Sequence, residues 1–166
     1  IAAAADAGVP VIGHCLGGQL MSKALGGTVT RNAVREIGWG QVDVLGHPLA
    51  RAWFGGLAAL FDAFHWHGET FSIPPGAVRL LSSPYCENQA FALGPHLAMQ
   101  CHVEMTEALI RRWCQDWGKE VTSLAAKTPS VQTPEEIMDA IDQKIGALHA
   151  VADCVYDQWA KGLVRK

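Results

Sequence analysis

The sequence predicts a mixed α/β domain, and three observations lead to this fold class. Short apolar runs alternate with helix-compatible segments near the start of the chain, and the middle is rich in strand-forming residues. A cysteine flanked by glycines stands between an apolar run and a helical segment, as in the nucleophile elbows of α/β enzymes. The last part of the chain has apolar residues at spacings of three and four, which indicates a helix that packs on another layer.

The N-terminal part is expected to form a helix, a strand and a second helix. Residues 1–7 are rich in alanine and end at Gly8, a common helix terminator. Residues 9–12 are an apolar run that fits a short buried strand. A second helix is expected at residues 19–25, and the glycine pair at 26–27 ends it.

The middle of the chain is expected to be mostly sheet. β-branched residues and apolar alternation predict strands at residues 28–32, 37–44, 60–67, 78–82, 89–93 and 97–101. The link at residues 47–60 is expected to be helical or irregular, and a loop at 68–76 contains two consecutive prolines. The last two strands are expected to form a hairpin around a Gly-Pro pair.

The C-terminal part is expected to be helical. A helix at residues 105–117 has Thr106 as its N-cap, and a polar link follows at 128–133. Pro134 then opens one long helix over residues 134–161, because proline is favoured in the first helical turn. The apolar residues of this helix recur every three or four positions: Ile137, Ile141, Ile145, Leu148, Ala152, Val155 and Trp159.

Composition and charge exclude several classes of protein. Hydrophobic residues make up 49% and charged residues 17% of the 166 residues, which fits a globular chain with a single domain. The net charge is -3 and no basic run is longer than Arg111–Arg112, so no nucleic-acid partner is expected. Glycine, proline, histidine and glutamine interrupt the longest uncharged stretches, so no membrane segment is expected. Five cysteines without a C-x-x-C pair indicate neither a disulfide framework nor a zinc ribbon, so a cytoplasmic location is expected.

The segment from Gly13 to Gln19 is the strongest functional signal in the chain. Cys15 has a glycine two residues before it and Gly17 two residues after it, so it can occupy a tight, strained turn. The following helix directs unpaired N–H groups at the sulfur, which favours the thiolate. The segment therefore predicts a cysteine nucleophile for acyl transfer; the alternative is a buried structural cysteine.

A second segment, Gln100 to Glu104, provides a partner for that nucleophile. His102 and Glu104 are two residues apart, so they share a side if the preceding strand continues. A neutral imidazole can take the thiol proton, and a carboxylate can orient it and stabilise the imidazolium. The alternative is a surface His-Glu pair at a helix start.

These segments together resemble class I glutamine amidotransferases. Residues 13–19 resemble the family signature G-x-C-x-G-x-Q, and residues 100–104 resemble its closing Q-F-H-P-E, with cysteine and valine in place of phenylalanine and proline. Residues 65–69 are similar to the S-H-G-D region of the GMP synthetase glutaminase domain. Residues 87–91 resemble a segment before the final hairpin in stand-alone, GMP-synthetase-like members. The resemblance extends over about residues 9–117 and implies a flavodoxin-like mixed sheet flanked by helices.

The resemblance implies a catalytic triad of Cys15, His102 and Glu104. The cysteine would attack the side-chain amide of glutamine and form a glutamyl thioester. The histidine would take the thiol proton, protonate the leaving ammonia and then activate water, while the glutamate orients it.

The resemblance also implies a set of binding residues. The backbone N–H of Leu16 would be one oxyanion donor, and Gln19 would help to hold the substrate. His67 and Gly68 would border the glutamine pocket.

Family members carry further β-α units before the elbow, including a glycine-rich turn with a second oxyanion N–H. We therefore expect the domain at residues 1–166 to be N-terminally incomplete, with the helix at 134–161 outside the family motifs.

The substrate is expected to be glutamine or another γ-glutamyl compound, and no cofactor is expected. The sequence shows no ATP-binding glycine-rich loop and no synthetase domain, so ammonia would pass to a synthetase, to another acceptor or to solvent. Homo-oligomer formation is left open. His65 and His67 alternate along a strand and could face one metal ion, but no third ligand is evident; a structural or pocket-lining role is favoured and no metal site is predicted.

Two other functions remain as alternatives. Dienelactone-hydrolase-like ester hydrolases also carry a Gly-x-Cys-x-Gly-Gly segment, followed by Asp and then His, an order that Asp62 with His96 or His102 fits. Gln19 and the His-x-Glu pair favour the amidotransferase. A non-catalytic binding subunit with the same fold is the third class.

Overall fold

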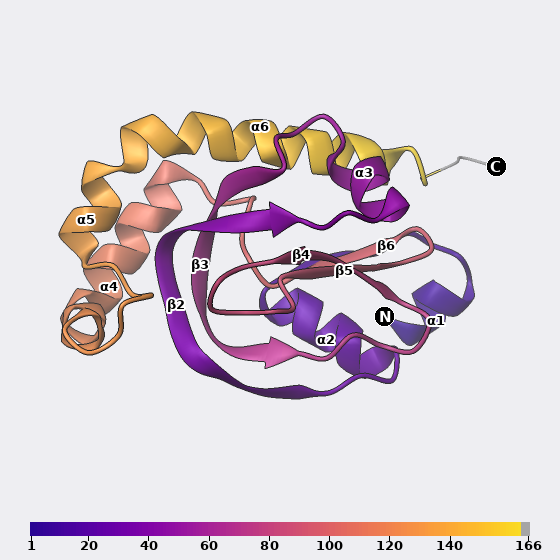
Figure 1. Ribbon diagram of the computed structural model, residues 1–166, viewed down its shortest axis with the longest axis horizontal. Helices are drawn as coiled ribbons and strands as arrows, with labels where there is room; N and C mark the ends of the chain where they lie inside the picture. Colours follow the sequence, from indigo (N-terminus) through magenta and orange to yellow (C-terminus); the bar gives the residue numbers. More distant parts are fainter. Residues whose placement is uncertain (164–166) are drawn as a thin grey trace.

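One mixed sheet runs through the whole protein, and helices cover both of its faces (Figure 1). The computed structural model describes residues 1–163. The sheet order is β1-β6-β5-β4-β2-β3; only β1 and β6 pair in parallel, and every other neighbouring pair is antiparallel. The strands are β1 (Ile12–His14), β2 (Val29–Val44), β3 (Leu60–Phe71), β4 (Val78–Ser82), β5 (Ala90–Leu93) and β6 (His96–Met99).

The helices are α1 (Ala2–Asp6), α2 (Leu16–Ala24), α3 (Pro48–Phe54), α4 (Glu107–Ala125), α5 (Pro134–Asp139) and α6 (Ile141–Ala160). In Figure 1, α6 lies on the opposite side of the central strands from α2. No helix within residues 1–163 combines the length and the apolar character needed to span a bilayer.

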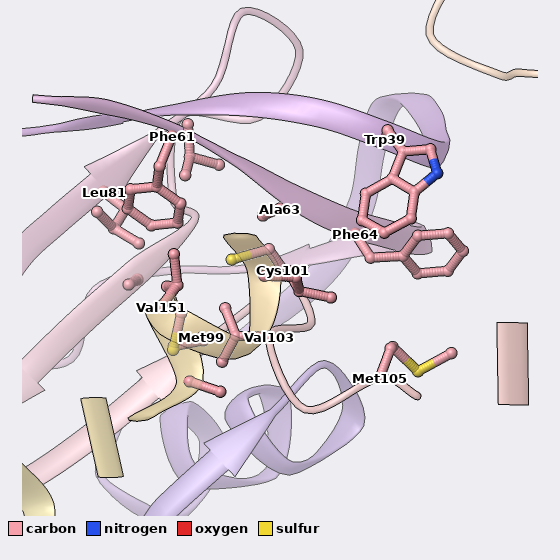
Figure 2. Close-up of a cluster of buried hydrophobic side chains, with 14 of the residues drawn as sticks. Trp39, Phe61, Ala63, Phe64, Leu81, Met99, Cys101, Val103, Met105 and Val151 are labelled. Carbon is pink, nitrogen blue, oxygen red and sulfur yellow. The ribbon is translucent and has the colours of Figure 1, made fainter. Parts of the chain in front are cut away.

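The two faces of the sheet bury separate sets of side chains. Along β5, Phe91 points to the α2 face and packs against Met21, while Ala90 and Ala92 point to the opposite face. That second face forms the larger core, which includes buried residues of α6 such as Val151 (Figure 2). Because side chains alternate along the central strands, the protein has two hydrophobic cores, one on each face of the sheet.

The predicted strand pattern is confirmed for β4 and for the β5–β6 hairpin, but it is wrong for the long ribbon of β2 and β3. The predicted strands at 28–32 and 37–44 are one strand, because the β2–β3 ladder shifts register between Arg31 and Glu36 instead of ending. The predicted loop at 68–76 also begins late, since β3 continues through Gly68 to Phe71.

The elements near the N-terminus differ from the prediction by a few residues. β1 is Ile12–His14 instead of residues 9–12, because Pro10 has no N–H and the N–H of Val11 donates to Nδ1 of His96 at 3.2 Å. The helix expected at 19–25 begins directly after Cys15. β6 is the only strand paired with β1 among residues 1–163, and the prediction of further strands beside β1 stays a prediction.

The C-terminal helices also differ in extent. The helix predicted at 105–117 continues through Gly118 to Ala125, with Thr106 as N-cap as expected. The predicted helix over 134–161 is divided at Ala140 into α5 and α6. A capping box between Thr133 and Glu136 fixes the start of α5.

The N-cap of α4 can be tested by mutation, because it anchors the start of this helix next to the site described below. The Thr106 hydroxyl accepts the N–H of Leu109 at 3.3 Å, so Thr106→Ala should lower the free energy of unfolding by about 1 kcal/mol. Thr122→Ala in the exposed interior of the same helix is the matched control and should change it by less than about 0.5 kcal/mol. Urea denaturation measures both, and equal effects of the two substitutions would contradict the cap assignment.

Candidate active site

Cys15 occupies a strained turn between β1 and α2. Its φ of 47° and ψ of -108° make it the only non-glycine residue with positive φ in the described chain. Its backbone N–H donates to the carbonyl of Met99 at 2.8 Å, which ties the turn to the end of β6. The geometry is that of a nucleophile elbow, with the side chain presented at the N-terminus of a helix.

The glycines around Cys15 let three backbone segments meet. A Cβ on Gly13 would lie 2.6 Å from the carbonyl carbon of Gly17. A Cβ on Gly18 would lie 2.5 Å from the carbonyl oxygen of Met99. Gly17, in contrast, is not crowded, because a Cβ there would meet no atom of the surrounding elements within 4 Å. Gly18 is the second crowded position.

β3 fixes the backbone of His102. The N–H of His102 donates to the carbonyl of Phe64 at 2.8 Å, and the N–H of Phe64 donates back to His102 at 3.1 Å. β6 has already ended at Met99, so His102 and Glu104 do not share a continuing strand as expected. They lie together because the turn after β6 is held against β3.

The carboxylate of Glu104 lies directly against the imidazole of His102. Oε1 of Glu104 is 2.5 Å from Nδ1 of His102, and Oε2 accepts the N–H of Val103 at 3.0 Å. This contact assigns the hydrogen to Nδ1, which leaves Nε2 as the acid-base atom. Burial acts to raise the pKa of Glu104, but the hydrogen bond to His102 and the positive charge of that imidazole outweigh it and lower the pKa.

The environment of His102 favours the imidazolium. Burial would lower the pKa of His102, but the Cys15 side chain and the Glu104 carboxylate outweigh it and raise the pKa to about 9. Nε2 is buried and has no other partner in the described chain, so it is the imidazole nitrogen left to interact with the Cys15 side chain, the contact that raises this pKa most. His102 is therefore held in its protonated form next to the Cys15 side chain.

Two polar groups contact the sulfur of Cys15 from other elements. The Gln100 amide nitrogen donates to Sγ at 3.6 Å, and Sγ lies 3.8 Å from the carbonyl oxygen of Trp66. Gln19 is buried, and its amide nitrogen donates to Oε1 of Gln100 at 3.1 Å and to the carbonyl of Glu69 at 3.5 Å. Gln19 is therefore positioned to orient Gln100. The sequence pattern gave no role to the Gln100 side chain itself.

Leu16 is the first residue of α2, and its side chain is 64% exposed. The first N–H groups of a helix have no acceptor within the helix, so the Leu16 N–H is available beside the nucleophile. A carbonyl oxygen bound there would carry its negative charge at the positive end of the helix dipole.

A cleft of about 540 Å³ lies beside this site, between β2 and β3. Its walls come from the irregular part of β2 and from the β3 segment that contacts Cys15 through Trp66. The lining residues are Arg31, Asn32, Ala33, Val34, Arg35, Ile37, Trp66, His67, Gly68 and Glu69. His67 and Gly68 are therefore on the wall of a cleft, although the His67 ring is buried behind it with Nδ1 2.9 Å from the carbonyl of Glu69.

The structure adds a third polar residue to the two histidines of β3. Glu36, His65 and His67 are buried, and their ligand atoms lie within 4.8 Å of one another, close enough to hold a metal ion. The Glu36 oxygens, however, already accept from Ser83 and Gln89 at 2.8 Å each. Burial lowers the pKa of His65 to about 4, so this histidine is neutral. The bonds from Ser83 and Gln89 to Glu36 favour a polar core over a metal site, and Nε2 of His67 lies 3.0 Å from the same carboxylate.

Tryptophans form an apolar wall over His102. The ring of Trp113 on α4 lies 5.6 Å from that of His102, edge to face. Trp66 and Trp117 pack against Trp113, with ring centroids 5.3 and 5.8 Å away. Burial against these rings limits water at the imidazole and strengthens its interactions with charged neighbours.

Cys101 does not belong to the site. Figure 2 shows it in the core beside Ala63 and Val103, and burial raises the pKa of its thiol well above the ordinary range. The ester-hydrolase alternative also loses its acid, because Asp62 pairs with Lys144 at 2.8 Å. His96 is committed as well, since its Nδ1 accepts the N–H of Val11.

Comparison with known proteins agrees with this geometry. A family model described as glutamine amidotransferase class-I matches residues 1–111. GMP synthase [glutamine-hydrolyzing] of Thermomicrobium roseum is 36% identical over 102 residues, which cover 60% of this chain and 19% of that protein. The glutamine amidotransferase-like protein YfeJ of Salmonella typhimurium is 32% identical over 122 residues, which cover 70% of this chain and 49% of that protein. The chain thus spans about a fifth to a half of the length of these relatives.

Solved structures extend the likeness to the whole chain. The crystal structure of a glutamine amido transferase from Methylobacillus flagellatus is 43% identical and has a TM-score of 0.94, covering 99% of this chain and 67% of that one. A glutamine amidotransferase from Thermotoga maritima is 25% identical with a TM-score of 0.83, covering 96% of this chain and 66% of that one. The mixed sheet predicted from the sequence is therefore confirmed together with its family.

The raised pKa of His102 predicts a specific pH dependence of stability. A folded-state pKa of about 9 against an ordinary value of 6.5 stabilises the fold below pH 6.5, and this stabilisation is lost as the pH rises through 9. The free energy of unfolding should therefore fall between pH 6.5 and 9.5, by on the order of 3 kcal/mol. His102→Gln should remove this part of the decline in urea denaturation, and an identical decline in both proteins would contradict the assignment.

Proposed function

The chain belongs to the class I glutamine amidotransferase family, and from this premise we propose that it hydrolyses the side-chain amide of glutamine through Cys15, His102 and Glu104. The observation that carries the proposal is the strained cysteine at a helix N-terminus, beside an imidazole that a carboxylate holds through Nδ1. This arrangement supplies a nucleophile, a general acid-base and an orienting group in one place.

The proposed reaction begins with the thiolate of Cys15 attacking the amide carbon of glutamine. The tetrahedral intermediate collapses when His102 gives its proton to the nitrogen, so ammonia leaves and a glutamyl thioester forms. The neutral imidazole then takes a proton from water, and the hydroxide attacks the thioester. Glutamate leaves, and the thiolate-imidazolium pair is restored.

The binding residues follow from the same geometry. We assign the Leu16 N–H as one donor to the developing oxyanion. Gln19 acts on the reacting atoms through Gln100, since its amide is bonded to that side chain. His67 and Gly68 would meet the substrate through their backbone, because the His67 ring is held inside the fold.

The proposed partner is an enzyme that consumes ammonia, as the synthase activity named for the relatives requires of a glutaminase domain. A reducing cytoplasm would keep the reactive thiol intact. The size of the cleft favours γ-glutamyl amides with larger leaving groups as a second class of substrate, because about 540 Å³ lies in the range of pockets for molecules well above the size of glutamine.

Covalent labelling tests the nucleophile directly. A glutamine-mimicking diazoketone should alkylate Cys15 alone, and Cys15→Ser should abolish both labelling and ammonia release without changing the melting temperature by more than a few degrees. Cys154→Ser is the matched control, because this half-buried cysteine lies on α6 against the Trp53 carbonyl. An adduct on any other cysteine, found by peptide mass spectrometry, would show that the nucleophile is misassigned.

Substitution of the other two triad residues separates their roles. His102→Ala should reduce kcat/KM by about 10²–10⁴, the usual contribution of a general acid-base. Glu104→Gln should cost less, because the carboxylate orients and stabilises without transferring a proton. His47→Gln, at the cap of α3, is the control for histidine loss. Ammonia release measures all three, and small, equal effects at His102 and Glu104 would refute the triad.

A further inference from the structure

The two oxygens of Glu104 face two different histidines. Oε1 is 2.5 Å from Nδ1 of His102, and Oε2 is 3.4 Å from Nδ1 of His14. The side chain of Glu104 is 32% exposed, so Oε2 depends on the Val103 N–H and on His14 to stay directed away from water. His14 is the last residue of β1 and precedes the nucleophile directly.

Tyr156 of α6 holds the other side of the His14 ring. Its hydroxyl lies 3.0 Å from Nε2 of His14, and the two rings meet edge to face at 5.9 Å. Burial raises the pKa of the Tyr156 hydroxyl, and the nearby Glu104 carboxylate raises it further, so this group keeps its proton and can donate it.

These contacts select one tautomer of His14. If the Tyr156 hydroxyl donates to Nε2, the ring hydrogen is on Nδ1, which lies 3.4 Å from Oε2 of Glu104 without hydrogen-bond geometry, so the two groups attract each other through charge. In the opposite tautomer a lone pair on Nδ1 would face a carboxylate oxygen inside a largely buried site, which is repulsive. Burial also lowers the pKa of His14, as does the charge of His102, although Glu104 opposes them. His14 is therefore a neutral donor.

We propose that His14 and Tyr156 are positioning residues that hold Glu104 against His102, so that α6 takes part in the active site. The proposal rests on the catalytic roles given above for Glu104 and His102. It assigns a role to a helix that lies outside residues 1–111, the part that the family model matches. The series of contacts runs from α6 through β1 to the turn after β6.

His14 is not the only group that holds the Glu104 carboxylate, and this limits the expected loss of rate when His14 is replaced. Oε2 also accepts the N–H of Val103 at 3.0 Å, so loss of the His14 contact weakens the orientation of the carboxylate without freeing it completely. Loss of one such short polar contact corresponds to a rate decrease of about three- to tenfold. Binding of glutamine does not involve these groups, so KM should stay within about twofold.

The test combines histidine titration by nuclear magnetic resonance with steady-state kinetics on the full chain. Tyr156→Phe removes only the hydroxyl, and His14→Leu removes the donor to Glu104. His14→Asn is the rescue variant, because its amide N–H can take the place of Nδ1–H. Tyr85→Phe is the matched control, since Tyr85 is exposed on the loop after β4.

We expect the titration midpoint of His102 to fall from about 9 by about 0.5–1 pH unit in Tyr156→Phe and His14→Leu, which matches the three- to tenfold effect, and to stay near 9 in His14→Asn and Tyr85→Phe. Ammonia release should show the same order, with kcat reduced three- to tenfold. An unchanged midpoint in Tyr156→Phe would overturn the proposal, even if kcat fell.

Two further outcomes are distinguishable. Absence of glutaminase activity in the unsubstituted protein would refute the proposed function, while the titration would still decide whether Tyr156 acts on His102. If His14→Leu does not fold, Tyr156→Phe decides the matter, because loss of one hydroxyl leaves the ring packing on His14 in place.

Discussion

The parallel pairing of β1 with β6 is the constraint on which the site depends. Its register sets His14 opposite Met99, so the two strands end side by side at the same edge of the sheet. Cys15 follows β1, and the turn that carries His102 follows β6. The hydrogen bond from the Cys15 N–H to the Met99 carbonyl joins the two strand ends. Residues far apart in the sequence thereby meet without a dedicated loop, which is the usual advantage of carboxyl-terminal strand ends.

A second constraint is the need to neutralise buried charge. The thiol, the two imidazoles and the carboxylate form a series in which each charged group lies next to a group of opposite charge or a neutral donor. An unpaired ion in this apolar surrounding would be unfavourable by several kcal/mol. The tryptophan wall therefore both excludes water from the imidazole of His102 and increases the cost of any misplaced partner.

Local patterns in the sequence predict the elbow well, because its conformation depends on glycines within a few residues of Cys15. They also predict β4 and the β5–β6 hairpin, whose alternation is regular. They fail where a contact is made across the fold. Tyr156 is 142 positions from His14 in the chain, and no spacing within α6 distinguishes it from a packing residue. Gln100 was missed for the same reason, since its role depends on how β6 lies beside α2.

The shift of register in the β2–β3 ladder between Arg31 and Glu36 cannot be told from the end of a strand in the sequence, because both interrupt the apolar alternation. Because of this register shift, the two walls of the site differ in how much sequence change they tolerate. On the elbow wall, a single added carbon at Gly13 or Gly18 would collide with backbone atoms. On the opposite wall, residues 31–35 line the cleft where the ladder with β3 is interrupted, so side chains there can change without breaking strand pairing. Under the proposed function, a new leaving-group preference would thus evolve through substitutions in β2, while the residues around Cys15 stayed constant.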